Sequence, residues 1–207
     1  MITTRTKTAV PLGAALVLLA VAGAAYALGL PPFGQKATIK ASAVCGTLGA
    51  PDSTAATLNR LLPAESSYSF DDAMTDLRTD ASDDTYETSC FVNGGGRQLL
   101  SVTAEMAEYE TPDSWIEEAV AQLVSRRDLV PFAAGDKAVA AGSVAAIYVP
   151  CSSQGPDRHL SVVVDLNDRG GATGEQRRRD LITLARNTAV FAHEKAKCEA
   201  PSKVSAD

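Results

Sequence analysis

His159 and His193 are the chain's only histidines and therefore its only candidates for a histidine base or metal ligand. A serine or cysteine nucleophile needs a base within hydrogen-bonding distance, and no GxSxG or SxxK motif supports such a pair. His159 is expected at the surface, on the polar face of a strand whose other face carries Leu160 and Val162. His193 is expected in solvent beside Glu194. Catalysis by His159 with nearby acids is therefore the weaker interpretation, and we expect no cofactor or metal.

The four cysteines, Cys45, Cys90, Cys151 and Cys198, are widely spaced and form no CxxC pair. Tetrahedral zinc sites usually draw their ligands in close pairs, so this spacing favours two disulfides. The alternative is four reduced, buried cysteines in a cytosolic protein. Because disulfides persist outside the cytosol, the disulfide interpretation indicates an exported domain.

Geometry favours one of the three possible disulfide pairings. The strand that ends at Cys151 and the strand over 158–166 are expected to form an antiparallel hairpin, with Cys151 at its turn. A helix over 175–197 would be about 35 Å long and would run back along this hairpin, because its strands are about 30 Å long. The helix end brings Cys198 to Cys151, which leaves Cys45 to pair with Cys90.

An acid-rich segment over 65–84 is expected to be a long, solvated loop. Calcium prefers clustered oxygen ligands, but the spacing of these acids does not follow the EF-hand loop. Gly94–Gly96 and Gly170–Gly174 fit neither common phosphate-binding pattern, so we expect a hairpin turn and a helix lead-in there. The acidic stretch, which continues three residues past this segment, consists of Asp71, Asp72, Asp76, Asp80, Asp83, Asp84 and Glu87.

The last predicted helix is basic, and its arginines are a candidate patch for an anionic partner. Such a partner would be an acidic envelope polymer or lipid headgroups. The alternative is a solvated face with ion pairs to Glu175 and Asp180. The formal net charge of −6 argues against binding nucleic acid through its phosphates. The four arginines are Arg177, Arg178, Arg179 and Arg186.

Val10–Leu30 is apolar, carries no charge and follows Arg5 and Lys7. About 20 helical residues span a hydrocarbon core of about 30 Å, so residues 9–30 are predicted to be a transmembrane anchor, in contact with lipid through 10–30. Residues 1–8 would be cytoplasmic, and the cysteines place the C-terminal domain outside. A cleaved signal peptide is the alternative, because Ala25-Tyr26-Ala27 resembles a small-residue cleavage pattern.

Hydrophobic periodicity predicts an α+β domain over 43–200, with an antiparallel sheet and helices on one of its faces. Residues 31–42 are expected to be a linker and 201–207 a disordered tail. Asp52 or Ser53 is expected to cap the first helix. The expected strands cover 85–92, 99–106, 137–141, 144–151 and 158–166, and the expected helices cover 52–62, 112–127 and 175–197.

The two halves of the domain have similar patterns. Cys90 stands 61 positions before Cys151, and the apolar face of Leu100–Met106 stands 60 positions before that of Leu160–Leu166. These offsets predict two strand–turn–strand–helix units related by duplication. The alternative is a pair of unrelated amphipathic hairpins, which would match about as well.

Two short segments, Ala43-Val44-Cys45-Gly46-Thr47-Leu48 and Thr88-Ser89-Cys90-Phe91-Val92, carry a resemblance to a family. Residues from Cys45 to Met106 resemble actinobacterial envelope proteins of a family of unknown function, many of which are lipoproteins. This chain lacks the lipid-modified cysteine. The resemblance implies an envelope location and disulfides, and no activity.

These features together predict a membrane-anchored, extracytoplasmic binding or sensing module of the cell envelope that is not an enzyme. One alternative is an envelope hydrolase that uses His159 with nearby acids. The other is a structural subunit of an envelope complex, with another envelope protein as its partner.

The uncharged run Val10–Leu30 makes the membrane topology testable. The native protein should stay in the membrane fraction after a carbonate wash, while its C-terminal domain is open to external protease. Recovery of a soluble form that begins near Leu28 would instead establish a cleaved signal peptide.

Overall fold

The computed structural model describes residues 23–24, 36–76, 85–152, 158–168, 170 and 172–205. The chain divides into two units, Met1–Lys36 and Ala37–Asp207. No helix among the described residues is long and apolar enough to cross a membrane. Apart from Gly23 and Ala24, the predicted transmembrane anchor and the residues before it lie outside the described residues.

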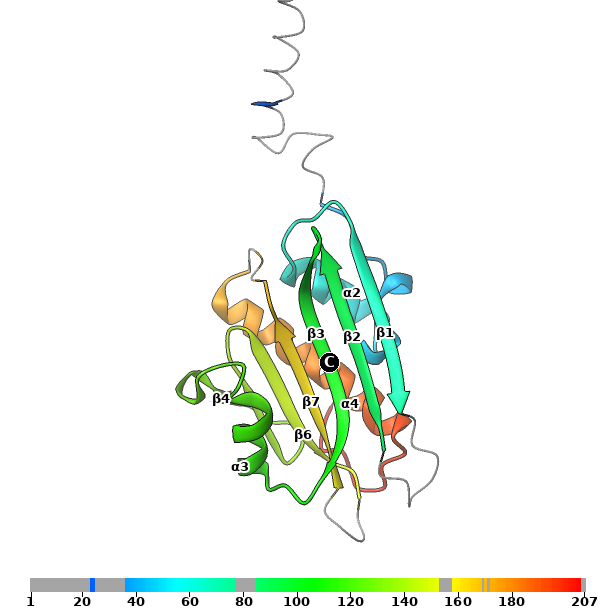
Figure 1. The fold of residues 1–207 in the computed structure, drawn as a ribbon, viewed down its shortest axis with the longest axis vertical. Coiled ribbons are helices and arrows are strands. Elements are labelled where there is room, and N and C mark those ends of the chain that lie inside the picture. The colour runs from blue at the N-terminus through cyan, green and yellow to red at the C-terminus, as the bar shows by residue number, and fades with distance from the viewer. Residues whose placement is uncertain are drawn as a thin grey trace, which may run out of the picture. The chain divides into compact units, whose positions relative to one another are not determined.

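The described part of the second unit is built on an antiparallel sheet of seven strands, in the order β1-β2-β3-β7-β6-β5-β4 (Figure 1). Together with three helices this sheet confirms the predicted α+β class. The strands are β1 (Tyr68–Asp76), β2 (Glu87–Gly94), β3 (Arg97–Glu108), β4 (Val130–Pro131), β5 (Lys137–Ala140), β6 (Val144–Pro150) and β7 (Arg158–Leu166).

Helices α2 (Pro51–Leu61) and α4 (Gly174–Lys195) cover one face of the sheet (Figure 1). Alternate residues of the strands point to this face, as the period of a β-strand requires. They pack with the helices into the main hydrophobic core, where burial of apolar surface contributes about 25 cal/mol per Å². Fully buried members include Leu58, Leu100, Val102, Ile147, Val162, Val164, Leu181 and Leu184.

Helix α3 (Pro112–Trp115) and the π-helical turn that continues it (Ile116–Val120) cover the opposite face, over β5, β6 and β7 (Figure 1). The prediction that all helices lie on one face is therefore wrong for α3. The helix also stops before the predicted end at residue 127. Its contacts form a second, smaller core with Trp115, Ile116, Val120, Val139, Ala141, Val144, Ala146 and Tyr148.

Strand β1 (Tyr68–Asp76) replaces part of the acidic loop predicted over 65–84. It pairs only with β2 in the described sheet, so it is an edge strand, where charged residues are common. The Asp72 carboxylate accepts hydrogen bonds from the backbone nitrogen of Gly46 at 2.6 Å and the hydroxyl of Thr47 at 2.7 Å. These bonds explain why an acid-rich segment is ordered here. Residues 77–84, which contain Asp80, Asp83 and Asp84, lie outside the described residues.

The ends of the domain also differ from the prediction. Ala50 caps α2 with a φ of 35°, and Pro51 takes the first helical position instead of Asp52 or Ser53. Ile39, placed in the linker, is buried and hydrogen-bonded to the side chain of Asn59. Lys203, placed in the disordered tail, accepts a hydrogen bond from the backbone of Gly135 at 3.1 Å. The folded unit is thus longer at both ends than 43–200.

Both disulfides form as predicted, Cys45–Cys90 and Cys151–Cys198. Helix α4 returns along β6 and β7 and ends with Lys197 in the left-handed region, at a φ of 51°. The backbone nitrogen of Cys198 then donates to the carbonyl of His193 at 3.1 Å, which completes a Schellman cap and turns Cys198 toward Cys151.

The sheet has local two-fold symmetry about the Thr103–Val163 pair, which preserves the predicted offset of 60 positions between β3 and β7. Val102 of β3 and Val162 of β7 are equivalent under this symmetry. Val102 pairs with Cys90 and Val162 pairs with Ile147, so the equivalent of Cys90 in β6 is Ile147 and not Cys151. That offset is 57 positions and not the predicted 61. A two-fold axis normal to the sheet would also place α3 and α4 on one face, so the helices do not follow the symmetry.

The two disulfides close loops of nearly equal length, with sequence separations of 45 and 47. The chain-entropy model therefore predicts that removal of either bridge, by a double Cys→Ser substitution, lowers the free energy of unfolding by about 4 kcal/mol. Urea denaturation of the full chain in detergent measures both losses. Losses that differ by more than about 2 kcal/mol would mean that native-state strain or contacts, and not loop closure, set the effect.

Candidate functional site

His159 is fully buried, so the expectation that it lies at the surface is wrong. It sits in β7 between Ala107 of β3 and Pro150 of β6, on the sheet face that carries α3. Its ring stacks on the ring of Tyr148, with centroids 3.8 Å apart and planes 11° from parallel. The second core, which forms on this face, removes the ring from water.

Other aromatic and polar side chains lie next to His159, between α3 and the sheet. Trp115 meets Tyr148 edge-on, with ring centroids 5.8 Å apart. The indole nitrogen of Trp115 donates to the hydroxyl of Ser161 at 2.9 Å, which satisfies two buried polar groups. The rings of Trp115, Tyr148 and His159 therefore form one rigid layer between α3 and the sheet.

Glu110 lies at the edge of this layer, where its backbone is hydrogen-bonded to Tyr148 and its side chain approaches His159. The Tyr148 hydroxyl donates to the Glu110 carbonyl oxygen at 3.0 Å. The Oε2 atom of Glu110 lies 3.2 Å from Nε2 of His159, although the contact lacks hydrogen-bond geometry. Neither ring nitrogen of His159 makes a hydrogen bond to the described residues.

The pKa values of both members of this pair depart from their ordinary values, in opposite directions. Burial lowers the pKa of His159 to about 4, so the ring is neutral at pH 7. Burial also raises the pKa of Glu110, followed by a hydrogen bond and repulsion from Glu118 and by repulsion from Glu105. Glu110 is therefore a partly buried acid beside other acids, with a neutral ring as its neighbour.

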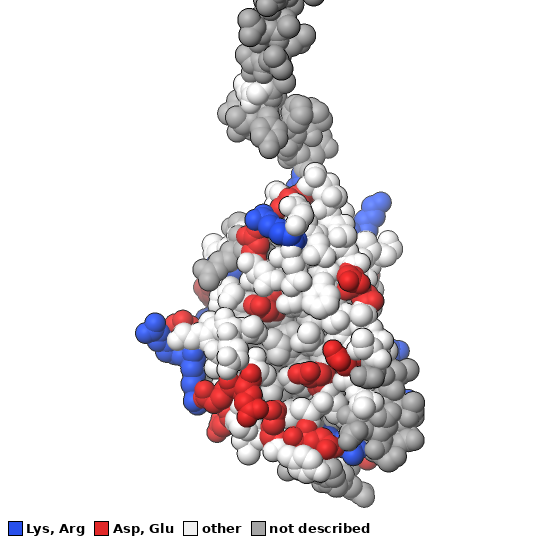
Figure 2. Space-filling view, viewed as in Figure 1, with Lys and Arg blue, Asp and Glu red and all other residues white. Residues whose placement is uncertain are grey.

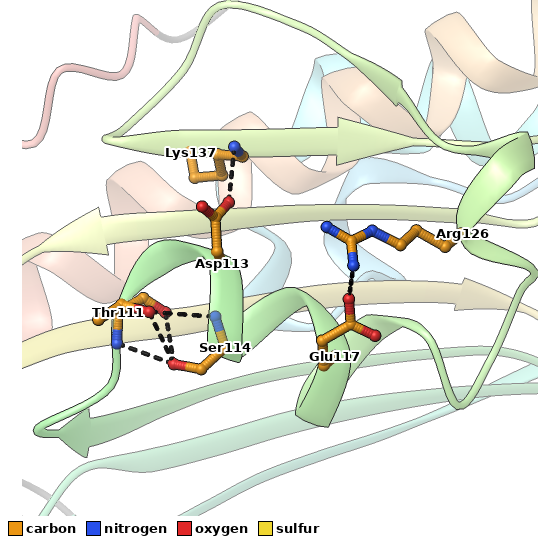
Figure 3. Close-up of polar contacts among 6 residues, drawn as sticks. All are labelled: Thr111, Asp113, Ser114, Glu117, Arg126 and Lys137. Carbon is orange, nitrogen blue, oxygen red and sulfur yellow. Dashed lines mark hydrogen bonds and ion pairs between the residues drawn. The ribbon is translucent and has the colours of Figure 1, made fainter.

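Helix α3 begins two residues after Glu110, and its first turn is held by local polar contacts (Figure 3). Strand β3 ends at Glu108, and Tyr109 adopts a left-handed φ of 62° that ends the extended run. Thr111 and Ser114 then form a capping box, each accepting from the other's backbone nitrogen. Asp113 pairs with Lys137 of β5 at 3.0 Å, which ties this turn to the sheet (Figure 3).

A pocket of about 320 Å³ opens beside Glu110. Two of its charged residues already have partners: Arg158 pairs with Glu108 at 2.5 Å, and Asp136 pairs with Lys203. No lysine or arginine among the described residues pairs with Glu110. The lining residues are Glu110, Thr111, Pro112, Asp136, Tyr148, Pro150, Ser152 and Arg158.

Acidic side chains gather on the lower part of this sheet face, as Figure 2 shows. The lower part of this face is therefore a region of negative potential. The described residues hold no group of three or more histidine, cysteine, aspartate or glutamate side chains that could bind a metal ion.

The other predicted site residues have structural roles. Nε2 of His193 lies 2.7 Å from the carbonyl oxygen of Ala200, so this histidine anchors the C-terminal segment. Asp180 is buried and pairs with Arg60 at 2.8 Å, which links α4 to α2.

The four candidate arginines do not form one patch, because Arg177 and Arg186 lie on opposite sides of α4 at 100° per residue. Arg179 and Arg186 share a face. Arg179 pairs with Glu175 at 2.8 Å, as the alternative interpretation proposed, while Arg186 donates to the carbonyl of Ala133 at 3.3 Å.

Sequence reasoning missed Glu110 and Tyr148 as site residues. One signal was present: Val144–Val149 is an unbroken apolar run, which is typical of a strand buried on both faces. Such a strand implies a second layer over the face that carries His159. The approach of Glu110 had no local signal, because it depends on the pairing of β3 with β7.

No family model matches the chain, and no curated protein or solved structure is significantly similar to it.

The buried neutral state of His159 predicts a pH-dependent contribution to stability. Because the folded-state pKa of about 4 lies below the ordinary value of 6.5, this contribution is complete above pH 6.5 and is lost as the pH falls toward 4. Relative to His159→Phe, which keeps a stacked ring, the wild type should lose about 3 kcal/mol of unfolding free energy between pH 7 and pH 4.

Urea denaturation followed by fluorescence of Trp115, the chain's single tryptophan, measures this difference. The raised pKa values of Glu105, Glu110 and Asp165 act in the opposite direction, so the wild type must be compared with the variant and not with itself. Parallel stability curves for the two proteins would show that His159 titrates normally.

Proposed function

We propose that this chain is a membrane-anchored, extracytoplasmic binding module of the cell envelope, and that the Glu110 pocket is its ligand site. The observation that carries the proposal is Glu110 itself. Tyr148 hydrogen-bonds its backbone carbonyl, its carboxylate lies 3.2 Å from the ring of His159, and the residue lines a pocket of about 320 Å³. Ligand sites are typically preformed pockets of about this size with a few fixed polar groups.

The hydrolase alternative has less support. His159, its proposed catalytic residue, is fully buried and does not line the pocket. A base that acts on an envelope polymer must reach the proton that it removes. The contacts of His159 instead suit a positioning role, because it packs on Tyr148 and lies against the Glu110 carboxylate.

The structural-subunit alternative would require a large apolar surface for a permanent partner. The large hydrophobic residues that are exposed in the described part of the chain come from four separate segments: Met74, Tyr109, Leu123 and Val130. Scattered exposed residues of this kind are normal for a soluble surface. A binding module with a small ligand site fits this surface better.

The envelope location rests on two features. Two disulfides suit an oxidising compartment, and the apolar run Val10–Leu30 suits an anchor. The resemblance of Cys45–Met106 to actinobacterial envelope proteins supports the same location. With cleavage near Ala27 the same domain would be secreted.

Filling the pocket tests the proposal in cells. In a strain that lacks the gene, Ser152→Tyr should fail to restore the lost phenotype, because the new ring occupies the pocket that Ser152 lines. Ser125→Tyr is the matched control, since Ser125 is exposed and does not line the pocket, and it should restore the phenotype fully. Immunoblots of membrane fractions verify that both variants are exported and stable.

His159→Phe separates binding from hydrolysis in the same assay. A binding module should tolerate this change at pH 7, because a neutral ring still packs on Tyr148. Failure of a stable, exported His159→Phe variant together with success of Ser152→Tyr would refute the proposal and favour the hydrolase.

A further inference from the structure

We infer that the pocket binds a small ligand through an ammonium group, with the Glu110 carboxylate as its counter-ion. This inference rests on the proposed function, since it names the ligand class of the same pocket.

The negative charge of the Glu110 carboxylate has no positive partner among the described residues. Glu110 lines the pocket and its side chain is only 25% exposed, yet no lysine or arginine among the described residues pairs with it. A partly buried carboxylate is costly unless a positive group or hydrogen-bond donors stabilise it. Glu105 and Glu118 repel it further, and the hydrogen bond with Glu118 raises its pKa, so it favours the neutral acid over the carboxylate. A cationic ligand would relieve this cost.

The buried ring of His159 lacks hydrogen-bond partners among the described residues. It is fully buried, its Nε2 atom faces the Glu110 carboxylate at 3.2 Å, and neither of its nitrogens makes a hydrogen bond to the described residues. A protonated imidazole would neutralise Glu110 and close the site to other cations. Burial keeps the ring neutral, so Glu110 remains available to a cation from the solvent.

The other lining groups suit an ammonium ion. An ammonium group donates three hydrogen bonds, and the lining includes Thr111 and Ser152, residues with hydroxyl side chains, beside Glu110. Calcium would need six to eight oxygen ligands, and the described residues hold no group of three metal-binding side chains. An anion would need Arg158, whose guanidinium is already paired with Glu108 at 2.5 Å.

Titration of the full chain in detergent with n-butylammonium chloride at pH 7 tests this inference. Amide chemical shifts around the pocket should saturate with a Kd on the order of millimolar, as expected for one charge-assisted contact. Glu110→Gln should weaken this binding at least tenfold. Glu117→Gln is the matched control, because Glu117 is an exposed acid of the next helical turn that pairs with Arg126, and it should leave the Kd unchanged (Figure 3).

If Glu110→Gln does not fold, a chemical-shift measurement on the wild-type protein still tests the inference. In the wild type, n-butylammonium should shift the side-chain carboxyl carbon of Glu110 and leave that of Glu117 in place. Saturable binding without a shift at Glu110 would overturn the inference.

Three further probes separate failure of this inference from failure of the proposed function. Equal binding of n-butanol, or binding of butyrate or calcium in place of n-butylammonium, would overturn the ammonium class while the pocket remained a ligand site. Absence of binding by all four probes up to about 50 mM, a concentration well above the expected millimolar Kd, would count against both.

Discussion

The pairing of β3 with β7 is the constraint on which the rest of the domain depends. Nine residue pairs, from Leu100↔Leu166 to Glu108↔Arg158, join the two halves of the sheet. The same pairing places Arg158 opposite Glu108, where they form an ion pair, and brings the chain after β3 back over His159. A slip of one residue would turn His159 into the main core and remove its neighbour Glu110, because alternate residues of a strand face opposite sides.

The two disulfides and the contact between His159 and Glu110 lie on opposite faces of this sheet. Both disulfides belong to the face that α2 and α4 cover, where Cys45, Cys90 and Cys151 are part of the main core. The face under α3 has no covalent bridge among the described residues and is held instead by stacked rings and by the capping box before Trp115. This division leaves the pocket on the less strongly braced face, where local opening costs less.

Patterns within short stretches of sequence predicted the hairpins and one of the disulfides correctly. Alternation and glycine turns predicted the β2–β3 and β6–β7 hairpins, and helix length predicted the Cys151–Cys198 bridge. Strand β1 was missed because aspartate disfavours strands, whereas its pairing with β2 and the bonds from Gly46 and Thr47 to the Asp72 carboxylate depend on residues distant in sequence. The burial of His159 was missed because the alternation of apolar and polar residues in β7 was taken to mean that one face of the sheet is exposed to solvent. The unbroken apolar run of β6 indicated instead that both faces of the sheet are covered. Glu110 could not be predicted at all, since only the β3–β7 pairing brings it to His159.

The protonation state of His159 decides whether the Glu110 pocket is negative or neutral. Proton–nitrogen correlation spectra of the full chain in detergent, recorded from pH 3.5 to pH 8, report the state of this ring directly. The structure predicts a neutral imidazole at pH 7 that titrates with a pKa of about 4. A pKa above 7 would show that His159 is charged at pH 7 and is itself a cationic partner of Glu110, and would contradict the account of the pocket as a site for a cationic ligand.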